Sequence, residues 1–247
     1  MAKLDWLKRP IAHRGLHDAS KGVIENSASA VEAAIARGLA IEVDLQCAKD
    51  NKPVVFHDAM LDRLTSEIGP VISRSASELT SIPLRGSKDR ILSLRDLLAL
   101  IDGRVPLIIE IKSKWDDDDR FEANIASELA SYRGPVAVMS FDPNCVARFR
   151  TLLPSLPRGL ISETFEDEHH WSRLSSGRRF IMRHLLSSAI ARPNFIAYDI
   201  RALPALAPAL ARSLFGLPLL TWTVRDQAQK ARAANYADAM IFEGIEP

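Results

Sequence analysis

Eight short apolar segments, separated by stretches with helical periodicity, run along the length of this 247-residue chain. They are rich in Val, Ile and Leu and are bounded by turn-forming residues, which is typical of buried parallel strands. The segments are 10–13, 40–45, 106–111, 135–140, 158–161, 195–199, 218–223 and 239–242. Eight strands that alternate with helices in about 250 residues predict a (β/α)8 TIM barrel. A doubly wound open sheet is the structural alternative.

Local start and stop signals support the helices between these segments. Ser29 and Glu32 are expected to form a capping box, and Gly38 is expected to end the helix that follows. Asp142 followed by Pro143 is typical of an N-cap and a first helical residue. No repeat, linker or low-complexity tract divides the chain, so residues 1–247 are expected to form a single domain.

A further apolar segment, 52–57, breaks the alternation. It follows the second strand too closely to leave room for a crossover helix, so it predicts an extra antiparallel strand in a hairpin. The connection contains Asp50-Asn51, and Asn tolerates the positive φ of a tight turn. A two-residue turn there would place His57 directly opposite Asp44.

Composition limits the partners and the compartment. The net charge is +1, so the overall field favours neither nucleic acid nor an anionic membrane as a partner. Cys47 and Cys145 match no metal or redox spacing and indicate ordinary thiols in a reducing compartment. The first residues lack the features of a secretory signal, and no segment approaches the ~20 apolar residues of a membrane span. We therefore expect a cytoplasmic protein without stable membrane insertion.

Three acidic residues lie at predicted strand ends. Glu42 and Asp44 share one face of a strand because side chains alternate, and Glu110 ends another strand. A single carboxylate of this kind more often belongs to a surface salt bridge. Three of them, without cysteine, favour one divalent ion, with Mg²⁺ or Ca²⁺ first and Mn²⁺ as a further option.

Basic residues and histidines occupy the same strand ends. His13 and His57 suit a general acid and a general base, because imidazole titrates near neutral pH. Arg14 and Lys112 suit phosphate binding, although beside three carboxylates they also suit simple charge balance. This set of residues favours cleavage of a phosphate ester.

Other candidates have an equally good structural explanation. Glu25-Asn26 precedes the first helix and suits either substrate positioning or helix capping. Trp222 ends a strand and suits either an apolar part of a substrate or the core. His169-His170 lies in a loop expected at the barrel mouth, where it would line a headgroup pocket or belong to the surface. Gly-rich phosphate loops, HExxH and Gly-x-Ser-x-Gly motifs are absent from the sequence.

Six segments together resemble the glycerophosphodiester phosphodiesterase family: AHRG at 12–15, ENS at 25–27, IEVDL at 41–45, KDNKPVVFHD at 49–58, IIEIK at 108–112 and LTWTV at 220–224. The resemblance implies a barrel, a divalent metal and hydrolysis of a small glycerophosphodiester to glycerol 3-phosphate and an alcohol. It suggests attack by the substrate's own glycerol hydroxyl, giving a cyclic phosphate that water then opens. Position by position, the resemblance implies a metal site formed by Glu42, Asp44 and Glu110. It implies an acid–base pair formed by His13 and His57. It also implies a phosphate site formed by Arg14 and Lys112.

The chain departs from the family pattern in a few places. Ser27 stands where Thr is usual, Asn51 replaces a turn glycine, and Glu243 follows a strand that commonly ends in Thr-Asp. The inserted region 59–105 matches no known headgroup preference. Two alternatives stay open: a lysophospholipase D-like enzyme acting on lysolipids, and a barrel that binds a phosphorylated ligand without turnover. The neutral charge and the lack of an evident amphipathic anchor disfavour the lysolipid alternative. The alcohol and the oligomeric state are left open.

Overall fold

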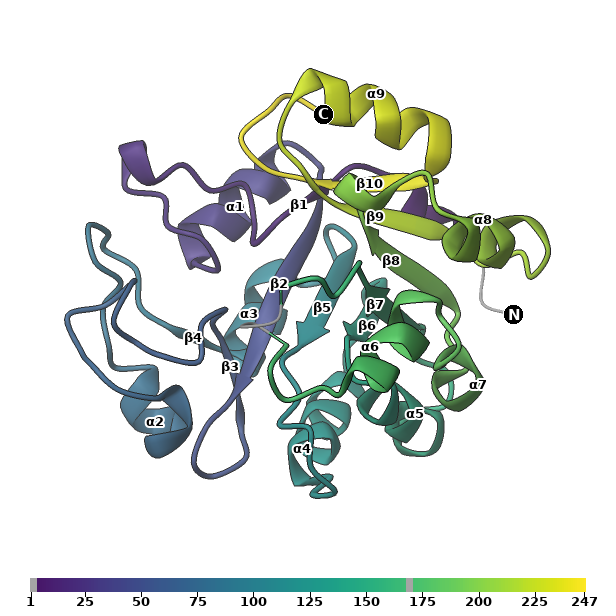
Figure 1. Cartoon of the computed structure of the whole chain (residues 1–247). Helices are drawn as coiled ribbons and strands as arrows, with labels where there is room; N and C mark the ends of the chain where they lie inside the picture. Colours follow the sequence, from purple (N-terminus) through teal and green to yellow (C-terminus); the bar gives the residue numbers. More distant parts are fainter. Residues whose placement is uncertain (1–3, 168–170) are drawn as a thin grey trace.

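A closed ring of parallel strands forms the centre of the protein, seen in a computed structural model that describes residues 4–167 and 171–247 (Figure 1). The strands are β1 (Ile11–Ala12), β2 (Ala40–Cys47), β5 (Leu107–Ile111), β6 (Val136–Ser140), β7 (Arg158–Ser162), β8 (Phe195–Asp199), β9 (Leu219–Val224) and β10 (Ala239–Phe242). β1 pairs with β10 on one side and with β2 on the other, so the ring closes. The predicted barrel is thus confirmed, and the open sheet is wrong.

Helices connect the strands around the outside of the ring (Figure 1). They are α1 (Ala28–Ala36), α3 (Leu94–Ile101), α4 (Arg120–Leu129), α5 (Pro143–Leu152), α6 (Ser176–Arg183), α7 (Ser188–Ala191), α8 (Leu206–Ser213) and α9 (Gln227–Tyr236), while the short α2 (Ala76–Leu79) belongs to the inserted region 59–105. Asp142 caps α5 with Pro143 as its first residue, as predicted. The capping box predicted at Ser29 is wrong: α1 starts two residues earlier, where the Ser27 hydroxyl accepts a hydrogen bond from the Ala30 amide.

The predicted extra strand is present as β3 (Pro53–Val55), antiparallel to β2, and the unpredicted β4 (Leu92–Ser93) pairs with it. The connection is a three-residue turn, since the Ala48 amide donates to the Lys52 carbonyl and Asn51 has φ 57°. A left-handed third residue is typical of such turns. The predicted register is therefore wrong by one residue, and Asp44 faces Phe56 instead of His57. His57 follows the last paired residue, so strand alternation does not fix its side chain.

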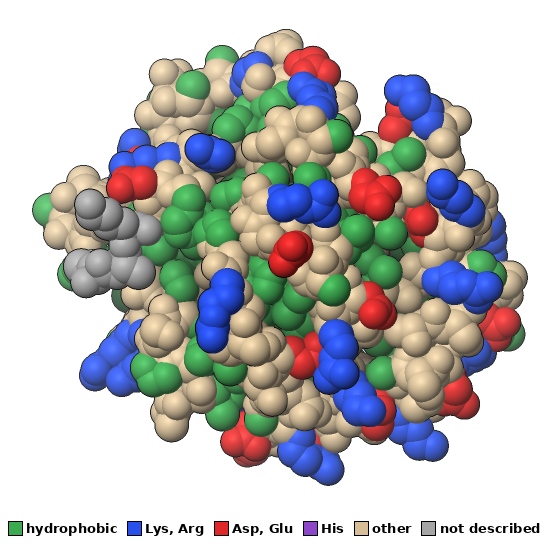
Figure 2. Space-filling model, turned by 180° about the vertical axis from the view of Figure 1, so that it is seen from behind, with side chains coloured by type: hydrophobic (Ala, Val, Ile, Leu, Met, Phe, Trp, Pro, Cys, Tyr) green, Lys and Arg blue, Asp and Glu red, His purple; other side chains and the backbone are tan. Residues whose placement is uncertain are grey.

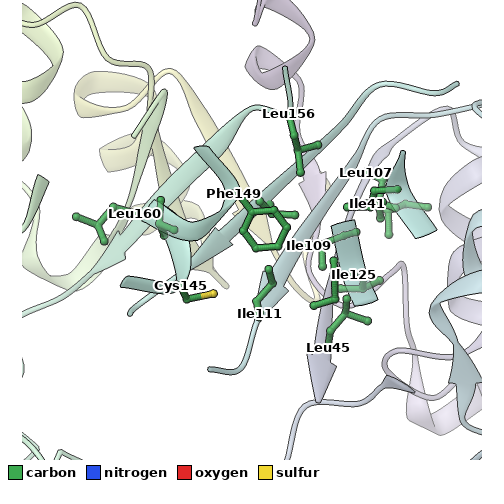
Figure 3. Close-up of a cluster of buried hydrophobic side chains, with 14 of the residues drawn as sticks. Ile41, Leu45, Leu107, Ile109, Ile111, Ile125, Cys145, Phe149, Leu156 and Leu160 are labelled. Atoms are coloured by element: carbon green, nitrogen blue, oxygen red, sulfur yellow. The ribbon is translucent and has the colours of Figure 1, made fainter. Parts of the chain in front are cut away.

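Two apolar layers hold the barrel together. Outward-facing side chains of the strands pack under the helices, as Figure 3 shows for Ile109 and Ile111 near Ile125 and Phe149. The inward-facing layer includes Ile108 of β5 and residues of the seven other barrel strands. Alternation continues this inner face upward from Ile108 to Glu110, at the carboxyl end of β5. Polar groups therefore begin where the inner apolar layer stops.

Within the described residues, no helix is both long enough and apolar enough to cross a membrane. The face seen from behind carries acidic and basic side chains interspersed with hydrophobic ones (Figure 2). The cytoplasmic location stays a prediction.

Candidate active site

The carboxyl ends of adjacent strands bring the predicted site residues together. Glu42 and Asp44 lie on β2, and Asp44 is in register with Glu110 of β5. His13 directly follows β1, which pairs with the start of β2. In barrels of this kind the carboxyl ends of the strands form the mouth where catalysis takes place. Closure of the ring places the site at that mouth.

The three carboxylates offer oxygen atoms that all lie within 4.8 Å of one another. Glu42 and Asp44 are each 1% exposed, and Glu42 Oε1 has no hydrogen-bond partner among the described residues. Burial, together with the charges of Asp44 and Glu110, raises the pKa of Glu42 well above its usual value. Converging oxygens with an unsatisfied buried atom fit a hard divalent cation, which relieves both the repulsion and the missing partner.

Lys112 and Arg14 contact the same carboxylates. Lys112 Nζ lies 2.9 Å from Asp44 Oδ1 and 2.5 Å from Glu110 Oε1, while Arg14 Nε lies 3.3 Å from Asp44 Oδ2. Burial opposes ionisation of Asp44, but the charges of Lys112, His57 and Arg14 outweigh it and hold the pKa of Asp44 below its usual range. Three carboxylates against these two cations leave one negative charge when all are ionised.

The His-Arg-Gly segment needs its glycine to reach this position. Gly15 has φ +78°, and a Cβ atom there would lie 2.8 Å from the Cβ of Ala30 on α1. Only glycine accepts both the left-handed backbone and the close approach. The turn lets the amides of Arg14 and Gly15 donate to the Glu42 carboxylate and carbonyl respectively, each over 3.1 Å.

Glu25 and Asn26 contact two residues of the site, Arg14 and Asp44 respectively. Asn26 Nδ2 donates to Asp44 Oδ2 over 2.9 Å, and the Asp44 amide donates back to Asn26 Oδ1 over 3.2 Å. Arg14 Nη1 donates to Glu25 Oε1 over 2.7 Å. The structure thus gives both residues a positioning task, and their predicted contact with substrate stays a prediction.

The two candidate catalytic histidines, His13 and His57, each have a carboxylate at Nδ1. His13 Nδ1 lies 2.9 Å from Glu243 Oε2, and His57 Nδ1 lies 2.7 Å from Asp58 Oδ1. An ionised carboxylate at Nδ1 favours the proton on that atom and leaves Nε2 for proton transfer. His13 Nε2 lies 4.0 Å from Glu42 Oε2, on the side of the three carboxylates. Burial lowers the pKa of His13, and burial with the charge of Lys112 lowers that of His57 to about 4.

Three further residues complete these contacts, and no role was predicted for them. The hydrogen bond with His13 lowers the pKa of Glu243 to about 2. Arg63, from the inserted region, donates to Asp58 Oδ2 over 2.6 Å and to Glu25 Oε2 over 2.9 Å. The sequence positions of two of them give a partial sign that they belong to the site: Asp58 adjoins His57, and Glu243 follows a strand end. Arg63 carries no such signal, because it reaches the site through the insertion.

An aromatic wall borders the site at Trp222. The Trp222 ring meets Phe141 edge-on at 5.6 Å, and Phe141 lies 5.1 Å from Trp171. The indole Nε1 of Trp222 is buried without a hydrogen-bond partner among the described residues. We call the apolar group beside it the mouth cluster; its members are Trp115, Phe141, Phe165, Trp171, Leu174 and Met182. The predicted candidates His169 and His170 lie outside the described residues.

Comparison with known proteins matches this geometry to a family. Residues 13–245 match the model of the glycerophosphoryl diester phosphodiesterase family. The chain belongs to that family. Its enzyme class is therefore phosphodiesterase, which removes the alternative of a barrel without turnover.

Individual relatives cover nearly the same span. A candidate glycerophosphodiester phosphodiesterase of Bacillus subtilis, YhdW, is 31% identical over 95% of this chain and 97% of its own length. A second Bacillus subtilis protein, a glycerophosphodiester phosphodiesterase, is 25% identical over 94% of this chain and 82% of its own. An Oleispira antarctica phosphodiesterase, solved with its product sn-glycerol-3-phosphate, superposes with a TM-score of 0.78 at 19% identity, covering 96% of this chain and 93% of that one. The last comparison supports the barrel fold.

Proposed function

We propose that this protein hydrolyses glycerophosphodiesters to glycerol 3-phosphate and an alcohol, using one divalent metal ion and two histidines. The observation that carries the proposal is the pair of histidine–carboxylate contacts beside three converging carboxylates. Family membership supports the reaction class. The product bound to the Oleispira antarctica phosphodiesterase supports the glycerol phosphate part.

Glu42, Asp44 and Glu110 would hold the metal ion. When bound, such an ion neutralises phosphate charge and lowers the barrier to attack at phosphorus. Its identity among Mg²⁺, Ca²⁺ and Mn²⁺ is not fixed by these ligands, because all three ions prefer oxygen.

Arg14 and Lys112 would bind the phosphate from the side of Asp44. Both cations are already ordered by carboxylates, so little side-chain entropy is lost when a phosphate oxygen arrives. Trp222 would contact the substrate as well, since a substrate oxygen would satisfy its buried Nε1. Glu25 and Asn26 keep Arg14 and Asp44 in place for this contact.

The proton transfers would take place at the Nε2 atoms of His13 and His57. One imidazole takes the proton of the attacking hydroxyl as its oxygen bonds to phosphorus. The other gives a proton to the leaving oxygen as the bond between phosphorus and that oxygen breaks. We propose that the first attack comes from the substrate's glycerol hydroxyl, and that water opens the cyclic phosphate in a second transfer. Glu243 and Asp58 hold each ring in the required tautomer.

Single alanine substitutions test this assignment. His13→Ala and His57→Ala should each lower kcat for glycerophosphocholine by about 10²–10⁴-fold, while KM changes little. In the nitrophenyl ester of glycerol phosphate, the leaving group needs no proton. On this substrate, the variant that lacks the general acid should recover most of the wild-type rate. Turnover of glycerophosphocholine close to wild type in both variants would remove the two-histidine mechanism.

A second candidate substrate is an intact lysolipid. The specific observation in its favour is the pair of partly exposed rings Phe141 and Trp222, which would border an acyl chain. Measuring release of choline from lysophosphatidylcholine and from glycerophosphocholine under the same conditions separates the two. A higher kcat/KM for the lysolipid would make it the preferred substrate.

A further inference from the structure

One arginine of the inserted region 59–105 binds two carboxylates at once. Arg63 Nε and Nη2 donate to the two oxygens of Asp58 over 2.6 and 2.9 Å. Its Nη1 and Nη2 donate to the two oxygens of Glu25 over 2.9 and 2.8 Å. Each carboxylate is therefore held by a pair of N–H groups, an arrangement that a planar guanidinium allows and a lysine ammonium does not. We call these three residues the Arg63 bridge.

The Arg63 bridge ends at two functional groups of the site. Asp58 Oδ1, which accepts from Arg63 Nη2, also contacts His57 Nδ1 over 2.7 Å. Glu25 Oε1, which accepts from the same Arg63 nitrogen, also accepts from Arg14 Nη1 over 2.7 Å. The bridge thus connects the imidazole of His57 to the guanidinium of Arg14 through a continuous series of hydrogen bonds between charged groups.

The inserted region fixes the backbone on both sides of Arg63. Leu61 and Thr65 are completely buried, and the Thr65 hydroxyl donates to the Leu61 carbonyl over 3.0 Å. Leu61 packs in the same apolar cluster as the residues that directly precede Glu25 and His57. The Arg63 side chain itself is 47% exposed, so its contacts are the polar ones of the bridge and not those of a core residue.

An isolated surface ion pair contributes little, but bidentate geometry and membership of a network make the Arg63 bridge different. Its carboxylates, Asp58 and Glu25, are only 23% and 13% exposed, so solvent screens them less. The carboxylate of His13 has no matching connection. Arg225 donates to Glu243 over 2.9 Å, and in the part of the chain that the structure describes it contacts no second carboxylate.

We infer that Arg63 is a positioning residue that aligns His57 and Arg14 with each other and thereby brings the inserted region into the active site. The inference rests on the proposed function, which gives His57 a proton transfer and Arg14 the phosphate. Without the guanidinium, Asp58 and Glu25 each lose two hydrogen bonds, and the groups they orient are held less firmly. Misplacement of a reacting group by about 1 Å can cost about 10²-fold in rate, so the loss should appear in catalysis.

Arg63→Ala tests the inference with glycerophosphocholine as substrate. It should lower kcat by about 10–100-fold through His57 and raise KM by about fivefold through Arg14. Asp58→Asn should lower kcat and change KM little, whereas Glu25→Gln should mainly raise KM. When Arg63→Ala and Asp58→Asn are combined, kcat should fall little below that of Arg63→Ala alone, because both changes break the same connection.

Two measurements without turnover separate this inference from the proposed function. In calorimetric titrations with Mg²⁺ present, Arg63→Ala should bind sn-glycerol 3-phosphate about fivefold more weakly than wild type. In proton NMR without substrate, the Nδ1 proton of His57, identified by its absence from His57→Ala, should exchange faster with water in Arg63→Ala. Absence of product binding by wild type would count against the proposed function, and the NMR measurement would still test the bridge.

A matched control comes from the same inserted region. Arg74 pairs with Glu67 over 2.8 Å, and its side chain is 30% exposed. Arg74→Ala should leave kcat, KM, product binding and proton exchange at their wild-type values. Arg63→Lys keeps the charge without the fork and should restore only part of the loss. Guanidinium ions should restore turnover to Arg63→Ala, because the exposed position lets the ion enter, whereas a misfolded variant would not respond.

Three results would overturn the inference. One is wild-type kcat, KM and proton exchange in Arg63→Ala. Another is an equal loss in Arg74→Ala, because the effect would then belong to the inserted region as a whole. The third is a double variant in which the two losses of kcat multiply, since Arg63 would then act independently of Asp58.

Discussion

At the scale of single residues, the site consists of buried charged groups, and the ionisation of each depends on its neighbours. Asp44 contacts Lys112, Arg14 and Asn26, so its ionised form is strongly favoured. Among the described residues, the Glu42 carboxylate accepts a hydrogen bond only from the Arg14 amide, and its Oε1 has no partner. The two carboxylates share a strand face, yet they differ in how readily they ionise. Glu42 is the group that gains most from a bound cation.

Glu42→Gln should separate metal binding from stability. Losing a direct ligand should weaken metal affinity at least about tenfold, as even indirect partners of a metal site do, and excess metal should restore activity only in part. The metal-free protein should unfold no more easily than wild type, because the substitution removes repulsion with Asp44 and Glu110. Metal titrations of activity and urea unfolding with chelator measure both effects. Glu32→Gln, at an exposed position of α1, is the control, and equal metal affinity in the two variants would contradict the assignment.

Asp58→Asn should change how stability depends on pH. Burial opposes ionisation of Asp58, but hydrogen bonds from Arg63 and His57 lower its pKa to about 2, below the ~3.9 of an unfolded chain. The stabilisation from this lowered pKa is therefore present above about pH 4 and disappears as the pH falls toward 2. In urea unfolding from pH 6 to pH 3, wild type should lose its advantage over the variant as the pH drops. A constant difference across that range would rule out this linkage.

At the scale of elements, the close packing of β7 against β8 can be tested with a glycine-to-alanine substitution. A Cβ atom at Gly159 of β7 would lie 2.2 Å from the ring of Phe195, which is completely buried in β8. Gly159→Ala should destabilise the protein by about 1–3 kcal/mol, because the ring has no room to move. Gly177→Ala in α6 has no neighbour within 4 Å and should be neutral or stabilising. Denaturant midpoints of the two variants make the comparison, and equal midpoints would mean that the ring can shift.

Elements were easier to predict than their exact contacts. The strands could be predicted because each is a short run of branched apolar residues with polar groups at its end, which depends on local sequence alone. The register of β2 and β3 could not, because Asn51 accepts a left-handed backbone in either a two-residue or a three-residue turn. Likewise Ser27 and Ser29 are equally good caps, and packing of α1 against the barrel selects between them. The three carboxylates could be predicted as site residues because they lie at the ends of these recognisable strands. The position of Arg63 could not be predicted, because it depends on how the inserted region folds.

At the scale of the whole molecule, a metal ion held by the three carboxylates would couple ion binding to global stability. A metal ion that binds only the folded barrel should stabilise it by about 2.7 kcal/mol at a concentration a hundred times its Kd. For a protein of this size, that corresponds to a rise in Tm of roughly 5–10 °C. Calorimetry with and without EDTA measures the shift, and activity should disappear with EDTA and return with added metal. Full activity after exhaustive chelation would show that the carboxylates serve another purpose.

The contact between His13 and Glu243 spans 230 positions and crosses the seam where β1 meets β10. All the proposed metal and proton-transfer groups lie before β6, yet the partner of His13 arrives with the final strand. A fragment cut between α4 and β6 would thus contain the reactive groups without a closed ring to orient them. Two such halves, produced separately, should be inert alone and recover turnover when mixed. The barrel is therefore a natural scaffold for a split-enzyme reporter of fragment reassembly.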